Sequence, residues 1–152
     1  MSLFLSTVVN KVDRKGRVSV PSHFRAALSN QSFPGVILFR SYTSPTLEGC
    51  GIDRMQTLSE SVDRLDLFSE THDDLASTLF AEAQQLAWDQ DGRIFLPDSL
   101  KEFAQLTDAA AFVGRGATFQ IWNPNVFEKH QADVRKRIKE KGATLKLAKE
   151  PA

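Results

Sequence analysis

A thirteen-residue pattern that occurs twice constrains the fold of this chain more than any other feature. Residues 13–25 read DRKGRVSVPSHFR and residues 89–101 read DQDGRIFLPDSLK, with aspartate, glycine, arginine and proline at matching positions. An internal duplication of this kind indicates two copies of one supersecondary unit that share a core, because a single copy buries too little apolar surface. Four further pairs differ only conservatively: Val18 and Ile94, Val20 and Leu96, Phe24 and Leu100, and Arg25 and Lys101.

The repeat extends beyond the shared pattern. The segment 35–40 corresponds to 110–115, and 50–55 corresponds to 119–124, with a longer connection in the first copy. Alternating or β-prone residues surround each glycine-bearing turn, so each unit begins with two strands that form either a hairpin or a sharp β corner. The expected strands are 7–12, 17–20, 35–39 and 50–53 in the first unit and 84–88, 93–96, 110–114 and 118–122 in the second.

Helices are expected after each pair of initial strands and at the end of each unit. Proline at the start of a helix predicts short helices over 22–28 and 98–104, for which Ser22 and Asp98 could provide N-caps. Apolar residues at helical spacing predict further helices within 56–82 and after Asn123. The expected organisation is a first half (1–55), a helical connector (56–82), a second half with a C-terminal helix (83–141) and a disordered tail (142–152).

The charged residues are segregated along the chain although the net charge is zero. Residues 1–52 carry six basic and two acidic side chains, whereas residues 53–82 carry two basic and eight acidic ones. Residues 128–152 carry eight basic and four acidic side chains. A local basic patch can attract a polyanion even when the total charge is zero.

The doubled motif D-x-x-G-R-x-x-x-P, together with FQIWNP at 119–124, resembles the MraZ family. That family is related to AbrB/SpoVT-type swapped-hairpin DNA-binding domains. The resemblance implies an α+β fold with tandem duplicated swapped-hairpin β-barrel halves that share a core, with flanking helices. It also implies a sequence-specific transcriptional regulator of the division and cell-wall gene cluster. Such a regulator would bind repeated promoter sites in double-stranded DNA as a ring-like homo-oligomer.

The DNA contacts are expected in the first repeat. Arginine can hold guanine O6 and N7 bidentately, whereas lysine more often contacts phosphate. Nothing structural requires two adjacent cations at positions 14 and 15, so a functional role is favoured for them. The second loop has only one basic residue and carries Asp91, so its contact with DNA stays open. The candidate DNA-binding residues are Arg14, Lys15 and Arg17, with Arg93 secondary and Lys11 and Arg25 nearby.

A structural role in the turn is the competing explanation for the other motif residues. Gly16 and Gly92 would let the backbone turn tightly, and Asp13 and Asp89 would accept amide hydrogen bonds or hold the arginines. Arg17 and Arg93 suit both bracing and DNA reading. Arg25 could simply lie on the solvent face of its helix.

Motifs for catalysis or cofactor binding are missing from the sequence. The three histidines and Cys50 have no metal-ligand spacing, and neither a phosphate-binding loop nor a G-x-S-x-G elbow occurs. We therefore expect no enzyme, no metal, no cofactor and no small-molecule substrate. A single cysteine and the absence of a long apolar run predict a cytoplasmic protein without a membrane partner. The resemblance to a DNA-binding regulator implies that it is nucleoid-associated. The alternative functions are an oligomeric protein-interaction scaffold that uses the acidic connector and, third, a hydrolase with an unrecognised site.

Overall fold

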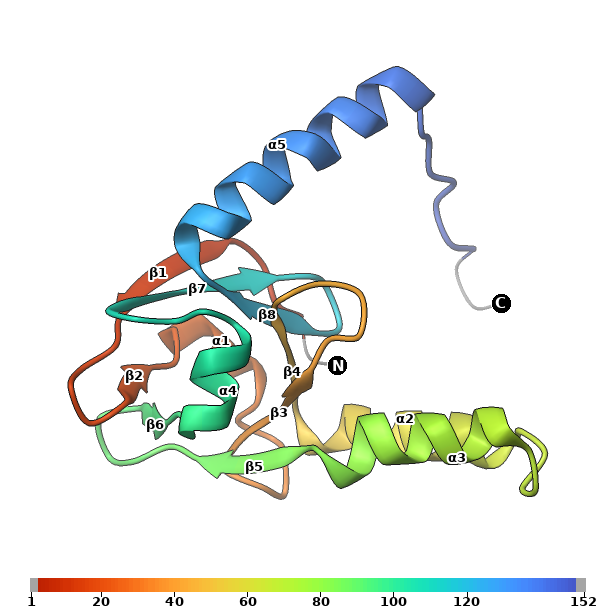
Figure 1. Cartoon of the computed structure of the whole chain (residues 1–152), viewed down its shortest axis with the longest axis horizontal. Coiled ribbons are helices and arrows are strands. Elements are labelled where there is room, and N and C mark those ends of the chain that lie inside the picture. Colours follow the sequence, from red (N-terminus) through yellow and green to blue (C-terminus); the bar gives the residue numbers. More distant parts are fainter. Residues whose placement is uncertain (1–2, 150–152) are drawn as a thin grey trace.

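The computed structural model describes residues 3–149, which form an α+β fold with two interleaved halves (Figure 1). The strands are β1 (Thr7–Lys11), β2 (Arg17–Ser19), β3 (Gly35–Arg40), β4 (Leu47–Cys50), β5 (Gln84–Ala87), β6 (Arg93–Phe95), β7 (Ala109–Gly114) and β8 (Phe119–Trp122). The helices are α1 (Ser22–Ala27), α2 (Ile52–Asp63), α3 (Glu70–Ala76), α4 (Asp98–Phe103) and α5 (Pro124–Lys141), with a π-helical segment η1 (Ser77–Ala81) after α3.

The first strand of each half pairs with a strand of the other half. Six strands form an antiparallel sheet in the order β1-β7-β8-β4-β3-β5, and β2 pairs with β6 in a separate two-stranded sheet. The first strand of each half therefore lies at the edge of the opposite half, β1 against β7 and β5 against β3. Val18 is paired with its own repeat equivalent, Ile94, at the centre of the two-stranded sheet. This exchange is the swapped-hairpin arrangement, so the predicted fold class is confirmed.

The strands on either side of each glycine turn do not form a hairpin. Between β1 and β2, a single bridge joins Val12 to Val18, after which the two strands pair with β7 and β6. Of the two alternatives, the sharp β corner is correct. We call residues 13–17 the first corner and residues 89–93 the second corner.

The core lies between the six-stranded sheet and the elements β2, β6, α1 and α4. Successive residues of β3 face opposite sides of the sheet. Val36 and Leu38 enter this core, whereas Ile37 and Phe39 are covered by α2 and η1 on the other face. Both faces of β3 are buried, which explains why its sequence is a continuous apolar run. Among the aromatic side chains of the sheet and its neighbouring loop, Phe33 is half-buried, whereas Phe39, Phe112, Phe119 and Trp122 are buried.

Several local expectations differ from the structure. The strand expected over 50–53 is β4 at Leu47–Cys50, because Gly51 already caps α2. Ser22 and Asp98 make no side-chain cap, since Pro21 and Pro97 occupy the N-cap positions of α1 and α4. At the start of α5 the expectation holds, where the side chain of Asn123 accepts hydrogen bonds from the amides of residues 125 and 126.

The molecule has a corner side and a helical side. Both corners lie on the left in Figure 1, whereas α5 and the α2–α3 pair project toward the right. Gly142 adopts a left-handed conformation and ends α5, after which residues 143–149 form neither helix nor strand. The remainder of the tail that we expected to be disordered, residues 150–152, lies outside the described residues. Within residues 3–149, every helix is too short or too polar to cross a bilayer.

Candidate nucleic-acid interface

Asp13 organises the first corner through both carboxylate oxygens. Its Oδ1 accepts the backbone amides of Lys15 and Arg17 at 2.9 Å each, and its Oδ2 accepts Arg17 Nε at 2.8 Å. The turn closes with two backbone bonds, from the Gly16 amide to the Asp13 carbonyl and from the Asp13 amide to the Arg17 carbonyl. Asp13 thus accepts turn amides and also holds Arg17 by an ion pair, the two roles that the sequence suggested for it.

The second corner has the same geometry with different side chains. Asp89 Oδ1 accepts the amides of Asp91 and Arg93 at 2.9 and 3.0 Å, and Asp89 Oδ2 accepts Arg93 Nε at 3.1 Å. Arg93 Nη2 also donates to Asp91 Oδ2 at 3.2 Å. Arg93 is therefore held by two carboxylates, whereas Arg17 is held by one.

Hydrogen bonding keeps both aspartates ionised. The Arg17 amide lowers the pKa of Asp13 below its ordinary value of 3.8, and the Arg17 side chain acts in the same direction. The Arg93 amide lowers the pKa of Asp89 in the same way. Carboxylates that accept several N–H donors resist protonation. The carboxylates of both corners therefore stay ionised, and keep their internal bonds, to a lower pH than an unperturbed aspartate would.

The tip of the first corner presents two exposed cations. Arg14 and Lys15 are exposed, and among residues 3–149 neither takes part in an ion pair. The equivalent positions of the second corner hold Gln90 and Asp91, which are also exposed. Lys11 is exposed at the end of β1, just before the first corner. The tip of the first corner thus carries two uncompensated positive charges, and the tip of the second carries none.

Arg25 and Lys101 each lie beside the corner of the other half, and not beside the corner that precedes them in the sequence. A Cβ atom placed on Gly92 would lie 2.5 Å from Arg25 Nε, so Arg25 belongs to the second corner rather than the first. A Cβ atom on Gly16 would lie 3.4 Å from Lys101 Nζ, so Lys101 lies beside the first corner. Sequence reasoning missed Lys101 at this site, because neighbours in the chain do not reveal which half packs against which loop.

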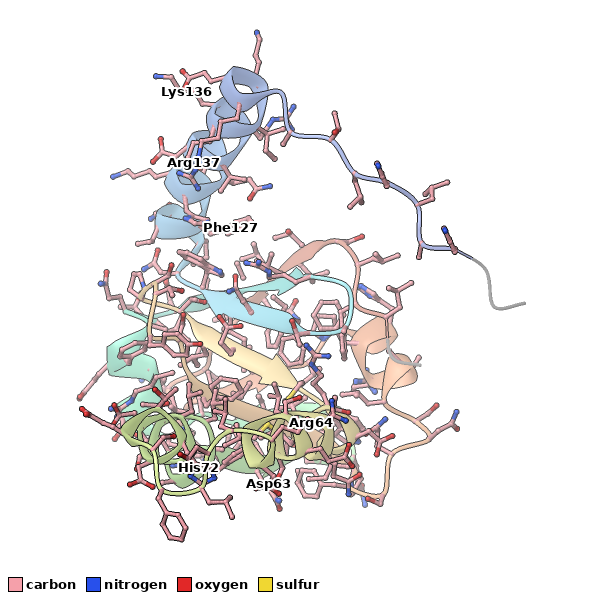
Figure 2. The ribbon with its side chains drawn as sticks, turned by 90° about the vertical axis from the view of Figure 1, so that its right-hand side faces the viewer. Asp63, Arg64, His72, Phe127, Lys136 and Arg137 are labelled. Atoms are coloured by element: carbon pink, nitrogen blue, oxygen red, sulfur yellow. The ribbon has the colours of Figure 1, made fainter. Side chains whose placement is uncertain are left out.

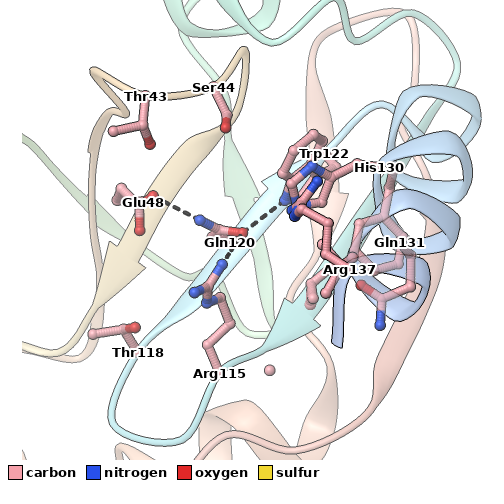
Figure 3. A pocket seen from close by; sticks show the side chains of 14 residues that line it. Thr43, Ser44, Glu48, Arg115, Thr118, Gln120, Trp122, His130, Gln131 and Arg137 are labelled. Atoms are coloured by element: carbon pink, nitrogen blue, oxygen red, sulfur yellow. Dashed lines mark hydrogen bonds between the residues drawn. The ribbon is translucent and has the colours of Figure 1, made fainter. Parts of the chain in front are cut away.

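A pocket of about 550 Å³ lies away from the corners, between α5 and the outer face of the sheet (Figure 3). Gln120 joins its polar groups: it donates to Glu48 at 2.7 Å and accepts from Arg115 at 3.0 Å. The Trp122 indole also donates to Gln120 at 2.8 Å. This network satisfies the polar side chains on that part of the sheet, which lies between two apolar clusters.

Neither a reactive thiol nor a metal-binding cluster is present among the described residues. Cys50 is buried, and burial raises its pKa to about 12, so it stays a protonated and poorly nucleophilic thiol. Among the side chains of residues 3–149, no group of three or more histidine, cysteine or acidic residues could hold a metal ion.

Comparison with known proteins places the chain among bacterial regulators. A family model described as "MraZ protein, putative antitoxin-like" matches residues 79–148. The protein named transcriptional regulator MraZ of Gluconacetobacter diazotrophicus is 48% identical over 143 residues, which cover 92% of this chain and 90% of that protein. Its namesake in Rickettsia akari is 43% identical over 148 residues, covering 97% and 99%. The Pelagibacter ubique protein of this name is 44% identical over 147 residues, covering 97% and 95%.

The similarity therefore extends over both halves of the chain and over nearly the whole length of each relative. The relatives are named as transcriptional regulators, which is a non-enzymatic role and agrees with the prediction that this chain is not an enzyme. The resemblance first drawn from the doubled corner motif is confirmed by these alignments. By identity and coverage, this chain belongs to the MraZ family.

Proposed function

We propose that this protein is a sequence-specific DNA-binding regulator of transcription that reads DNA with its first corner. The observation that carries the proposal is the pair of exposed cations, Arg14 and Lys15, at the tip of a rigid turn. A braced turn loses little conformational freedom when it binds, so more of the contact energy becomes affinity. The names of the relatives, which are transcriptional regulators, support the same role.

The residues of the first corner would divide the work of recognition. Arg14, at the exposed tip, would contact base edges in the major groove, where arginine can pair bidentately with guanine. Lys15 would contact phosphate and provide affinity that falls with salt. Arg17 donates its Nε to Asp13, so it would fix the turn and use its outer nitrogens for DNA.

The second corner would contribute less. Asp91 at its tip repels phosphate, and Arg93 is already engaged by Asp89 and Asp91. Both corners flank the β2–β6 sheet, so the second would lie near the same duplex when the first is bound (Figure 1). Arg93 would therefore be a secondary contact.

Affinity for repeated promoter sites would come from self-assembly. One corner per chain makes few contacts, but a ring-like homo-oligomer would present many identical corners to repeated sites and raise their effective concentration. Figure 2 shows the acidic α2–α3 connector on one side of the sheet and the basic part of α5, with Lys136 and Arg137, on the other. These projections carry opposite charge, so the acidic connector of one copy would meet α5 of the next. By family resemblance, the target would be the division and cell-wall gene cluster, and the protein would work at the nucleoid.

The proposal is tested by replacing the two tip cations in every subunit. The double variant Arg14→Ala/Lys15→Ala should lose at least about 100-fold in affinity for a duplex from directly upstream of its own gene. Fluorescence anisotropy at two salt concentrations would measure this loss, and sizing chromatography would confirm an unchanged oligomer. The matched control is Lys146→Ala/Lys149→Ala, which removes the same charge from the exposed segment that follows α5.

Retained binding by the corner variant would reject the proposal. Equal losses in both double variants would point to general attraction by net charge and would also reject it. A wild-type protein that captures other proteins but shows no salt-dependent DNA binding would favour the interaction scaffold instead.

A further inference from the structure

The two halves hold each other's corners through reciprocal hydrogen bonds. The Leu96 amide, just after β6, donates to the Gly16 carbonyl at 2.8 Å, and the Val20 amide donates to the Gly92 carbonyl at 2.9 Å. Each glycine has a positive φ, and each lies against the short helix of the other half. The surface around the first corner is therefore built partly by residues 96–101.

Lys101 is the cation that α4 brings to this surface. Its Nζ lies beside the Gly16 backbone, 3.4 Å from where a Cβ atom would stand. Its side chain is 22% exposed, and its ion partner is Asp98, at 3.4 Å from Nζ. Asp98 itself is 89% exposed, so the pair is open to water and weak. A lysine held in this way can exchange its carboxylate for another anion at small cost.

The charges around the two corners differ once these helices are included. The first corner brings together three cations of its own and Lys101, against the carboxylates of Asp13 and Asp98. The second corner has Arg93 and Arg25, against Asp89 and Asp91. Arg25 also donates its Nε to the Val20 carbonyl at 3.2 Å, so it is tied to the backbone. Of the two corners, the first therefore has an excess of positive charge, and the second is balanced.

We infer that Lys101 is a DNA-phosphate contact that the second half supplies to the first corner, with Asp98 as its counter-ion in the free protein. The inference rests on the proposed function, because it assigns a further residue to the same DNA-binding surface. When the tip of the corner enters a groove, the duplex backbone passes the base of the loop, where Lys101 lies. Lysine contributes there as a point charge, which gives affinity and salt dependence without reading sequence.

The test compares equivalent positions of the two halves. Lys101→Gln should weaken binding to the upstream duplex by about tenfold. The negative slope of log K against log salt should become shallower by about 0.9 for each engaged subunit. Arg25→Gln removes the same charge beside the second corner and should change both values clearly less, because Arg25 donates to the Val20 carbonyl and the second corner contributes less to binding. Lys101→Arg keeps the positive charge and should bind with the affinity of the wild type, since arginine occupies the equivalent position beside Gly92. A purely structural role would change the melting temperature without changing the salt slope.

A second variant relieves the counter-ion. Asp98→Ser gives α4 the residue with which α1 begins, Ser22, and should tighten binding about two- to fivefold. This variant also tests the inference if Lys101→Gln fails to fold, because unchanged affinity in Asp98→Ser would overturn it.

The possible results separate the two proposals. If Arg14→Ala/Lys15→Ala abolishes binding while Lys101→Gln keeps the wild-type affinity and slope, the inference is wrong and the proposed function stands. Equal losses in Lys101→Gln and Arg25→Gln would also overturn the inference. If the wild-type protein shows no salt-dependent binding to the duplex, both proposals fail.

Discussion

The two corners share one backbone design but differ in charge. Both use an aspartate that accepts two amides and an arginine Nε, and both turn on a glycine with positive φ. The residues at the two tip positions differ: Arg14 and Lys15 in the first corner, and Gln90 and Asp91 in the second. The comparison teaches that the repeated residues build the turn, while the residues that are not repeated set the charge that its tip presents.

The strongest way to break the comparison is to give the first corner the tip of the second. Arg14→Gln/Lys15→Asp should keep the fold, since the second corner already shows that these residues suit the turn. Affinity for the upstream duplex should fall by at least about 100-fold, because two cationic contacts are lost and a repelling carboxylate is added. Anisotropy titration measures the effect. Binding within a few-fold of wild type would mean that the tip does not meet DNA.

The reverse exchange should sharpen the comparison. Gln90→Arg/Asp91→Lys gives the second corner a cationic tip and frees Arg93 from one of its two carboxylates. Affinity should rise by about tenfold, and the salt slope should steepen by about 0.9 for each new phosphate contact. Gln90→Ala/Asp91→Ala serves as the control without added positive charge. If the reverse exchange leaves affinity and slope unchanged, the second corner does not approach the duplex.

Replacing each glycine separates stability from DNA binding. Gly16→Ala and Gly92→Ala both force alanine into positive φ and should each cost about 1–2 kcal/mol, seen as a melting temperature lower by about 2–8 °C. At Gly16 the new Cβ would lie 3.2 Å from the Leu96 carbonyl oxygen, a backbone atom, so the first corner would shift. At Gly92 it would lie 2.5 Å from Arg25 Nε, and the long side chain of Arg25 can move aside. DNA affinity should fall several-fold for Gly16→Ala only. Equal affinity losses in both variants would remove the functional difference between the corners.

The smallest expected effect is a pH dependence that both corners share. Because the pKa of Asp13 and that of Asp89 are lowered by folding, their stabilising contribution is present above about pH 4 and disappears as the pH falls through the lowered values. Asp13→Asn and Asp89→Asn should each unfold more readily than wild type at pH 7. Urea denaturation along a pH series should show each difference shrinking below pH 4. A difference that persists at the lowest pH would contradict this origin.

The elements of each half could be predicted from the sequence because their signals are local. Alternation around Val18 and Ile94, and the prolines before α1 and α4, identify strands and short helices without knowledge of the fold. The family resemblance added the swapped arrangement. Local pattern alone left hairpin and corner open, since it shows that Val18 is buried but not which strand pairs with it.

What escaped prediction depends on contacts between the halves. β4 begins at Leu47, although the sequence placed the residues before 50 in a connection between strands. Gly49 of β4 packs against the Phe119 ring of the other half, a contact that the sequence does not reveal. The exchange of Arg25 and Lys101 between corners depends on which helix packs against which turn. No spacing in the sequence reports such a contact. The sequence therefore indicated that Arg14 and Lys15 lie at an exposed tip, but not that Lys101 lies beside the same corner.

Hydrogen–deuterium exchange tests the central claim most directly, because it reports each corner separately in the unmodified protein. Amide exchange would be followed in peptides covering residues 13–17 and 89–93, with and without the upstream duplex. The account predicts strong protection of the first corner and little change at the second. Protection confined to the second corner, or to the basic end of α5, would contradict it.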